Sequence, residues 1–152
     1  MKAIYRLTAA ALALVGVVAA QAQVSCPAGT TQELDAAAWV KGKTLCATRG
    51  ALRWQEFHFD AVPGPGRRLI DYKLGPGHPM DETKDMGTWD ARGGNAGPSG
   101  GPVLVHIYSG GDSYAWLVCR EAGGSSWTLR STSTHGDITG ATLRTGQVAC
   151  GL

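Results

Sequence analysis

Glutamate, histidine and aspartate alternate in the segment "WQEFHFD", the part of the sequence best equipped for chemistry. In an extended strand every second side chain points to the same face, so Glu56, His58 and Asp60 would lie together. Two carboxylates beside an imidazole can hold a metal ion or transfer protons. Alternate side chains on one strand are about 6–7 Å apart, so a site also needs a neighbouring strand. His106 or His135 would be a suitable partner. Without such a partner, the three side chains form only a solvent-exposed polar face of the strand.

A serine lies in the glycine-rich segment "NAGPSGGPV", residues 95–103. The order G-x-S-G-G-P around Ser99 resembles the nucleophile segment of chymotrypsin-like serine proteases. Pro98 stands where that family has an aspartate, and this chain is too short for the double-barrel fold of those enzymes. We therefore expect residues 91–101 to form a loop between two strands, without a catalytic role for Ser99.

Five tryptophans lie in segments that we expect to form regular elements. Each buries a large apolar area, so its first expected place is the core. Indole rings also line pockets for sugars, lipids or partner chains. If the protein has a ligand site, we expect it to use four of the tryptophans and one histidine, namely Trp54, Trp89, Trp116, Trp127 and His58.

Residues 1–22 have the pattern of a secretory signal peptide. Lys2 and Arg6 precede the apolar run "LTAAALALVGVVAA", which is too short to span a bilayer, and a small-x-small cleavage signature follows it. We expect cleavage after Ala22 and a periplasmic or secreted protein. Lipidation of Cys26 is an alternative, although the residues before it match a leucine-led lipobox poorly.

Removal of this leader changes the charge balance of the chain. The sequence has 14 basic and 12 acidic residues, and two of the basic ones, Lys2 and Arg6, lie in the leader. Residues 23–152 therefore carry a net charge near zero, and Arg67-Arg68 is their only basic doublet. Nucleic-acid binders usually carry a basic patch, so we expect no nucleic-acid partner. About 130 residues suit a single domain, and we expect no transmembrane segment in it.

All four cysteines lie in the expected mature chain. In an oxidising compartment an even number of cysteines predicts disulfides, here two. Three pairings are possible, and proximity along the chain favours Cys26 with Cys46 and Cys119 with Cys150. A bond that closes such a short loop adds roughly 3 kcal/mol of stability. The sequence has no C-x-x-C pair, which argues against zinc, and nothing in it indicates a cofactor.

The segment "TTQELDAAAWVKGK" predicts one short helix, with Thr30 or Thr31 as its cap and Gly42 at its end. Beyond it, short segments rich in β-branched and aromatic residues alternate with glycine and proline, which predicts strands. Gly110-Gly111-Asp112 and Gly123-Gly124 are typical of hairpin turns. The expected strands are 43–48, 53–59, 67–74, 87–91, 102–109, 113–120, 125–132, 140–144 and 147–151.

Two of these segments, "VLVHIY" and "YAWLVC", are apolar on both faces, so we expect them in mid-sheet with cover on each side. The helix is the expected cover for one face. Together these patterns predict a mainly β fold. It is a small antiparallel barrel or sandwich, a meander of about eight strands, with one short N-terminal helix.

Gly87-Thr88-Trp89 resembles the G-x-W motif of lipocalins and the G-T-W motif of avidins. This resemblance implies a calycin-like barrel. More broadly, "GKTLC", "WQEFH", "DYKLGP" and "GTW" resemble a group of small exported proteins of Gram-negative bacteria. That resemblance implies export and a compact domain, and it implies no activity.

Because no convergent catalytic set is evident, we expect an exported binding or accessory protein with a protein partner, an inhibitor role included. The alternative is a calycin-like binder of a lipid or sugar with a tryptophan-lined cavity. The third hypothesis is a metal-dependent hydrolase that uses Glu56, His58 and Asp60. An open aromatic cavity favours a small-molecule ligand, whereas a filled interior with an exposed apolar patch favours a protein partner.

Overall fold

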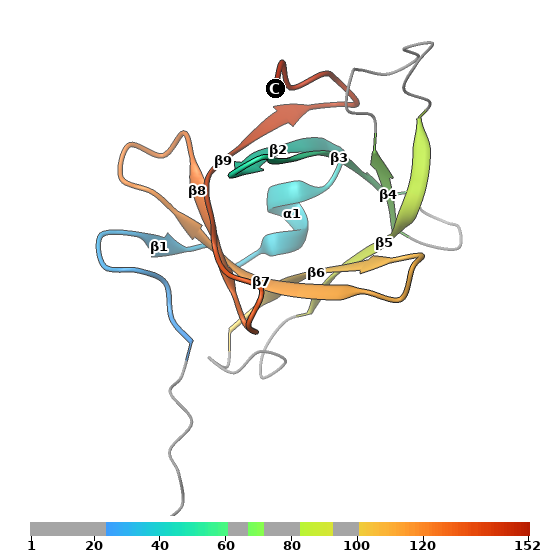
Figure 1. Ribbon diagram of the computed structural model, residues 1–152. Coiled ribbons are helices and arrows are strands. Elements are labelled where there is room, and N and C mark those ends of the chain that lie inside the picture. The colour runs from blue at the N-terminus through green and yellow to red at the C-terminus, as the bar shows by residue number, and fades with distance from the viewer. Residues whose placement is uncertain (1–23, 61–66, 72–82, 93–100) are drawn as a thin grey trace, which may run out of the picture.

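The computed structural model describes residues 24–60, 67–71, 83–92 and 101–152 (Figure 1). The expected signal peptide and the loop around Ser99 lie outside these ranges. Nine strands and one helix occur within them. The elements are β1 (Thr31–Gln32), α1 (Ala36–Val40), β2 (Lys43–Arg49), β3 (Leu52–Asp60), β4 (Arg67–Asp71), β5 (Lys84–Arg92), β6 (Val103–Tyr108), β7 (Ser113–Arg120), β8 (Trp127–Ser131) and β9 (Ile138–Thr145).

Strands β2 to β9 form a closed antiparallel barrel. Each strand pairs with the next along the chain, and β9 pairs back with β2, so the barrel is an up-and-down meander. The short strand β1 is an addition that pairs with the end of β7, beyond the residues of β7 that pair with β6. The predicted mainly β fold of about eight strands is confirmed, as a barrel rather than a sandwich.

The helix lies inside one end of the barrel, as the view along the barrel axis shows (Figure 1). It is shorter than predicted and starts later, because Asp35 caps it by accepting a 2.9 Å hydrogen bond from the N–H of Ala38. Thr31, one of the expected caps, lies in β1 instead. Trp39 and Val40 are buried among the inward-facing residues of the strands, so α1 closes this end of the barrel.

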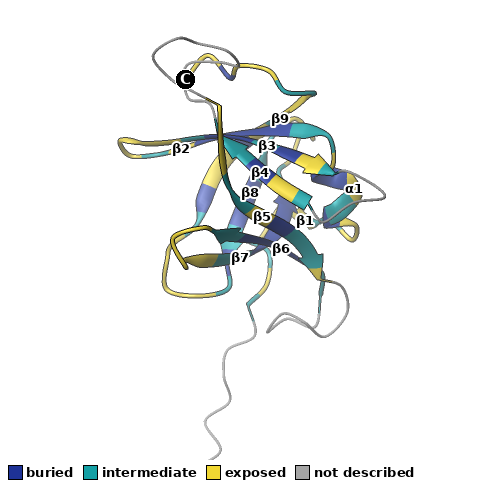
Figure 2. Ribbon diagram, turned by 90° about the vertical axis from the view of Figure 1, so that its right-hand side faces the viewer, coloured by how far each residue is buried: buried dark blue, intermediate teal, exposed yellow. Residues whose placement is uncertain are grey.

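Inward and outward side chains alternate along the strands, as the burial pattern shows (Figure 2). On β6, Leu104 belongs to the barrel core, while Val103 and Val105 belong to a second apolar cluster on the outside. Val24 and Cys26, in the segment before β1, pack against that outer cluster. The prediction that this strand is covered on both faces therefore agrees with the structure, and the outer cover is the N-terminal segment.

Both disulfides fasten a chain end to the outside of the barrel. The bonds are Cys26–Cys119 and Cys46–Cys150, so the expected pairing of Cys26 with Cys46 and of Cys119 with Cys150 is wrong. Cys46 lies on β2 and Cys119 on β7, with β8 and β9 between these strands. The N-terminal segment is bonded to β7 and the C-terminal segment to β2. Proximity along the sequence does not predict this arrangement.

The segment 147–151 is not the strand that the sequence predicts. It crosses the outer face of β3, where the N–H of Cys150 donates to the side-chain oxygen of Gln55. The disulfide with Cys46 and this side chain hold the segment in place of a ladder of backbone hydrogen bonds.

The glycine of the G-T-W motif lies where two strands approach closely. Gly87 has a φ of +145°, and a Cβ at this position would clash with the backbone of Ile107 on β6. The register between β4 and β5 also shifts next to it, between Leu69 and Ile70. Glycine therefore permits the bulge and the close approach, and Trp89 two residues later is buried in the core.

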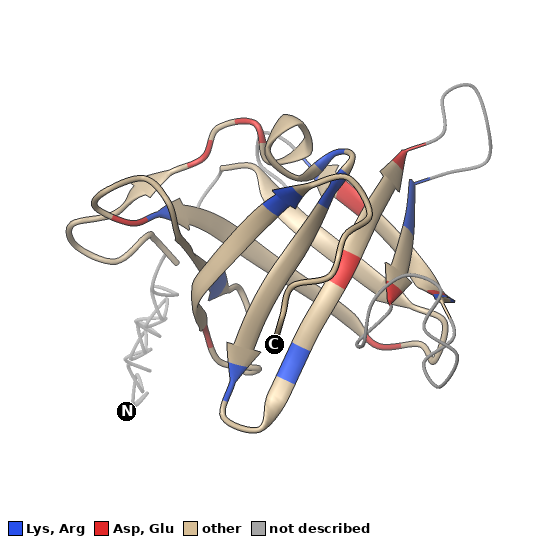
Figure 3. Ribbon diagram, turned by 90° about the horizontal axis from the view of Figure 1, so that it is seen from above, with Lys and Arg blue, Asp and Glu red and all other residues tan. Residues whose placement is uncertain are grey.

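Basic and acidic residues are interspersed over the strands and turns of the described chain (Figure 3). No helix among the described residues has the length and apolar character needed to cross a membrane.

Candidate functional site

A cavity of about 480 Å³ opens at the end of the barrel opposite α1. It is surrounded by the ends of the strands and by the turns that join them. Its lining consists of aromatic, apolar and charged side chains from seven of the strands and two of the turns: Arg49, Leu52, Arg53, Trp54, Glu56, Asp71, Met86, Tyr108, Gly110, Asp112, Tyr114, Trp116, His135 and Ile138.

Aromatic rings form much of the cavity wall. The rings of Tyr114 and Trp116, alternate residues of β7, are nearly parallel, with centroids 5.6 Å apart. Tyr108 on β6 meets Tyr114 edge to face at 5.7 Å, and the ring of His135 lies 4.6 Å from that of Tyr114. A wall of this kind suits a flat, largely apolar ligand, because ring faces and edges provide contact area without mobile side chains.

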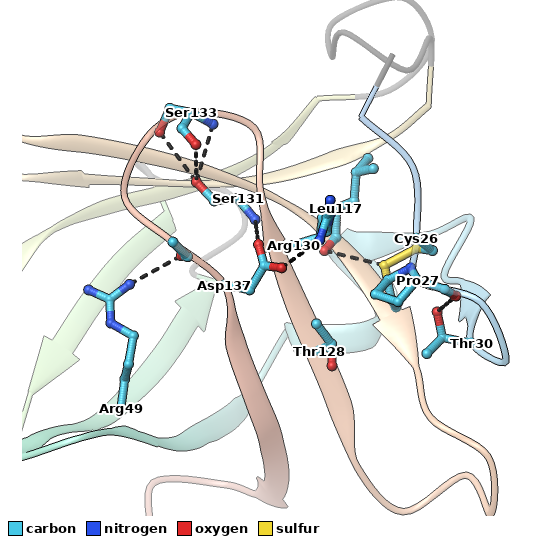
Figure 4. A network of polar contacts seen from close by, with 12 residues as sticks. Cys26, Pro27, Thr30, Arg49, Leu117, Thr128, Arg130, Ser131, Ser133 and Asp137 are labelled. Atoms are coloured by element: carbon cyan, nitrogen blue, oxygen red, sulfur yellow. Dashed lines mark hydrogen bonds and ion pairs between the residues drawn. A yellow bond between two sulfur atoms is a disulfide. The ribbon is translucent and has the colours of Figure 1, made fainter. Parts of the chain in front are cut away.

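The turn between β8 and β9 carries His135 and is anchored at several points (Figure 4). Asp137 accepts the N–H of Ser131 at 2.9 Å and forms an ion pair of 2.7 Å with Arg130. Arg49 donates to the carbonyl groups of His135 and Gly136, and the figure shows it extending toward this turn. The turn is thus fixed at the mouth of the cavity by contacts that originate on both β2 and β8.

Glu56 lies at the floor of the cavity, with only 6% of its side chain exposed. The hydroxyl of Tyr108 donates to its Oε1 at 2.5 Å, a length typical of a bond to an ionised carboxylate. Burial and the carboxylate raise the pKa of Tyr108 above its ordinary value, so the phenol keeps its proton and remains the donor. The carboxyl group of Glu56 therefore points one oxygen at Tyr108 and is held in place by it.

Two buried histidines stand behind Glu56. Nδ1 of His58 lies 3.1 Å from the backbone carbonyl of Glu56, and its Nε2 lies 2.9 Å from Nε2 of His106. A carbonyl only accepts, so Nδ1 of His58 carries the proton and Nε2 of His106 donates to His58. Burial, followed by the neighbouring His106, holds the pKa of His58 well below its ordinary value, which agrees with a neutral ring.

The other nitrogen of His106 faces the second carboxylate oxygen. Nδ1 of His106 lies 3.3 Å from Oε2 of Glu56, within ion-pair distance, but the orientation of the two groups does not make a hydrogen bond. Both atoms are buried, so this contact joins the carboxylate to the pair of histidine rings. Glu56, His106 and His58 therefore form one buried chain that ends at the cavity floor.

The structure brings only some of the predicted ligand residues together. Trp54 and Trp116 line the cavity. His58 and Trp89 lie below the floor, fully or almost fully buried, with their rings 5.5 Å apart. Trp127 lies at the opposite end, where it packs against the helix and donates to Glu33. The sequence did not show which of these residues would line the cavity, which would lie below its floor and which would lie at the opposite end of the barrel.

The structure brings together some residues of the metal hypothesis, but it does not arrange them to bind a metal ion. Glu56 and His58 do meet His106, whereas Asp60 forms a 3.0 Å ion pair with Lys41 at the other end. Both Nε2 atoms are used in the bond between the two rings. Among the described residues, no group of three histidine, cysteine or acidic side chains is arranged to hold a metal ion.

The sequence-based site omitted two residues that matter in the structure, Tyr108 and Tyr114. A signal for them existed, because Tyr108 alternates with His106 on one face of β6 and Tyr114 alternates with Trp116 on β7. The register places His106 opposite Tyr114. Alternation therefore identifies the face, and only the register identifies the cluster.

Comparisons with known proteins provide no relative from which to transfer a function. No family model, no curated protein and no solved structure matches the chain. The geometry of the cavity is therefore the basis for the function proposed below.

Proposed function

We propose that this protein binds a small organic molecule with a flat, largely apolar body in the open end of its barrel. A small β-barrel is compatible with a binding protein. The observation that carries the proposal is the cavity of about 480 Å³ with its aromatic wall. Ligand pockets typically measure about 300–1,000 Å³ and are mainly apolar, with few polar groups that fix orientation.

The arrangement of the lining supports a ligand with two parts. A ring system would lie against Trp54, Tyr114 and Trp116, which offer faces and edges at the mouth and side. A polar group would reach the floor, where the carboxylate of Glu56 accepts hydrogen bonds. This places the polar contact deep and the apolar contacts near the opening, so that water is displaced from the carboxylate as the ring enters.

A small-molecule ligand has more support than the protein partner that the sequence favoured. The large exposed apolar side chains of the described chain are dispersed: Leu52 and Phe59 lie toward opposite ends of β3, and Leu34, Val148 and Leu152 lie in segments outside the named elements. They form no patch that we can define as a docking surface. An open aromatic cavity, by contrast, is the feature that distinguishes the calycin-like alternative.

We also propose that the protein works outside the cytoplasm. Two disulfides, which join all four cysteines, support an oxidising compartment. Mass spectrometry of protein recovered from the periplasm or medium tests this proposal. A mature chain that starts at residue 23 is expected, and an uncleaved chain in the cytoplasm would contradict it.

Binding of the fluorescent probe N-phenyl-1-naphthylamine tests the function. Its two aromatic groups suit the wall, and fluorescence should rise in a saturable manner. Tyr114→Ala should weaken binding by roughly five- to twentyfold, since it removes a ring contact worth about 1–2 kcal/mol. Phe59→Ala is the matched control, because Phe59 is exposed at the other end of β3. No saturable binding, or equal weakening by both variants, would contradict the proposal.

A further inference from the structure

We infer that the ligand is an organic acid, and that Arg49 binds its carboxylate at the mouth of the cavity. This inference rests on the proposed function, because the ring of the ligand must occupy the aromatic cavity. It adds a third contact to the two already proposed, namely a negative charge held near the opening. The ligand class is a flat aromatic or conjugated molecule that carries a carboxylate at one end.

The arginines of the cavity lack acidic partners, and this is the first argument. Most arginines of the described chain form ion pairs with acidic side chains: Arg67, Arg68, Arg92, Arg120 and Arg130. Among the described residues no such partner is found for Arg144, which donates to a backbone carbonyl group, or for Arg49 and Arg53, which line the cavity. A guanidinium keeps its positive charge at physiological pH. A ligand carboxylate would supply the counter-ion that the described part of the barrel does not.

Arg49 is also held in place before any ligand arrives, which is the second argument. Its Nη1 donates to the carbonyl groups of His135 and Gly136, and its Cζ lies 5.5 Å from the ring centroid of Trp54. Within the described residues these hydrogen bonds use Nη1 alone, so Nε and Nη2 keep their N–H groups for a ligand. This edge of a guanidinium matches the two oxygens of a carboxylate. Arg49 is therefore a fixed carboxylate receptor beside a ring that can contact the body of the same ligand.

The acidic residues of the lining determine which way such a ligand enters. Glu56 lies at the floor, and Asp71 is its cross-strand partner on β4. Leu45 of β2 pairs with Glu56, and Arg49 follows it by four residues, so roughly 13 Å of strand separates the two levels. Asp112, in the turn between β6 and β7, lies across the barrel from β2 and β3. A carboxylate is therefore favoured beside Arg49 and disfavoured at the floor, which orients the ligand with its acid group outward.

Three naphthalene probes of similar shape and different charge test this inference. 2-Naphthoate is negative, 2-naphthamide is neutral and 2-naphthylmethylammonium is positive, and each competes with bound N-phenyl-1-naphthylamine. The naphthoate should bind about tenfold more tightly than the amide, because hydrogen bonds between charged groups are stronger than neutral ones. Arg49→Gln should reduce this preference to about twofold or less, and Arg49→Lys should keep part of it, since lysine has the charge but not the planar edge. Arg144→Gln is the matched control, because Arg144 pairs with Thr44 near the other end of β2.

The outcomes separate this inference from the proposed function. If N-phenyl-1-naphthylamine binds but the amide or the ammonium compound competes as well as the naphthoate, the carboxylate site is excluded and the binding function stands. If neither N-phenyl-1-naphthylamine nor, by calorimetry, the naphthoate binds, both are contradicted. An equal loss of preference in Arg144→Gln would contradict the assignment to Arg49.

Arg49 also holds the turn between β8 and β9, so its replacement could disturb the cavity itself. The affinity of each variant for N-phenyl-1-naphthylamine shows whether the cavity is intact, because this probe carries no charge. If Arg49→Gln no longer binds it, Arg49→Lys decides. A weaker preference of Arg49→Lys for the naphthoate over the amide supports the inference, and an unchanged preference overturns it.

Discussion

His58 should make the stability of the barrel depend on pH in weakly acidic solution. Its ring is completely buried, between Trp89 at 5.5 Å and His106 at 4.9 Å. Burial and the second imidazole hold its pKa well below the ordinary 6.5. The folded state therefore keeps His58 neutral at pH values where the unfolded chain binds a proton.

The direction of the pH effect on stability follows from this difference in proton binding between the folded and unfolded states. Above about pH 6.5 His58 is neutral in both states, and its contribution to the stability is fully present. As the pH falls below that value toward the pKa of the folded state, the unfolded chain takes up a proton and stability is lost. The loss approaches about 1.4 kcal/mol for each pH unit. Glu33 and Glu121 have lowered pKa values, so their effects begin below about pH 4.5 and do not overlap this range.

Urea unfolding between about pH 7.5 and 5.5, followed by tryptophan fluorescence, measures this dependence. The wild type is compared with His58→Gln, which has a side chain of similar polarity that does not titrate. The difference between their unfolding free energies should change by about 1 kcal/mol across the lower pH unit. Parallel curves would refute the reasoning. If the variant does not fold, an NMR titration of wild-type His58 decides, because a midpoint at or above 6.5 would equally refute it.

Two further predictions concern the framework of the barrel. Gly87→Ala should destabilise the protein by about 1–3 kcal/mol, because the new methyl group meets the backbone of Ile107; thermal unfolding checks this, and an unchanged midpoint would contradict the bulge. Joint replacement of Cys46 and Cys150 by serine should cost about 2–5 kcal/mol, since that bond joins residues 104 apart. Chemical denaturation measures the loss, and an unchanged free energy of unfolding would contradict this bond.

The strand pattern could be predicted from the sequence because it is local. Alternation along residues 53–59 places Glu56 and His58 on one face, and both side chains do point into the barrel. Glycine-rich turns joined neighbouring strands as expected, which makes a meander the simplest topology. Each of these inferences needs information from only a few adjacent residues.

The disulfides and the N-terminal helix could not be predicted in the same way. Cys46 and Cys119 are brought to the chain ends by the closure of the whole barrel, which no short segment encodes. Thr31 resembles a helix cap in isolation, but the free end of β7 offers it backbone partners, and β1 forms there instead. In both cases a long-range contact overrides a local preference.

The candidate site was predicted in part for a related reason. Side-chain alternation distinguishes the inside of a barrel from the outside, but it does not give the height of a residue along the barrel axis. Trp116 and Trp127 both lie on inward-facing positions, yet they are near opposite ends, one at the cavity and one beside α1. The height depends on the register between strands, which the pairing of the whole sheet sets.

The buried chain of Glu56, His106 and His58 is not needed to close the barrel. Removing charged and polar groups from water costs free energy, and apolar residues of similar size at such positions are often equally or more stabilising. Leu69 and Leu104, which lie beside these residues in β4 and β6, show that the same interior accepts aliphatic side chains. If stability were the only requirement, aliphatic side chains would also be expected at positions 56, 58 and 106. The polar groups lie instead under an open cavity, with the carboxylate at its floor, and this placement is the physical reason to connect them with a ligand.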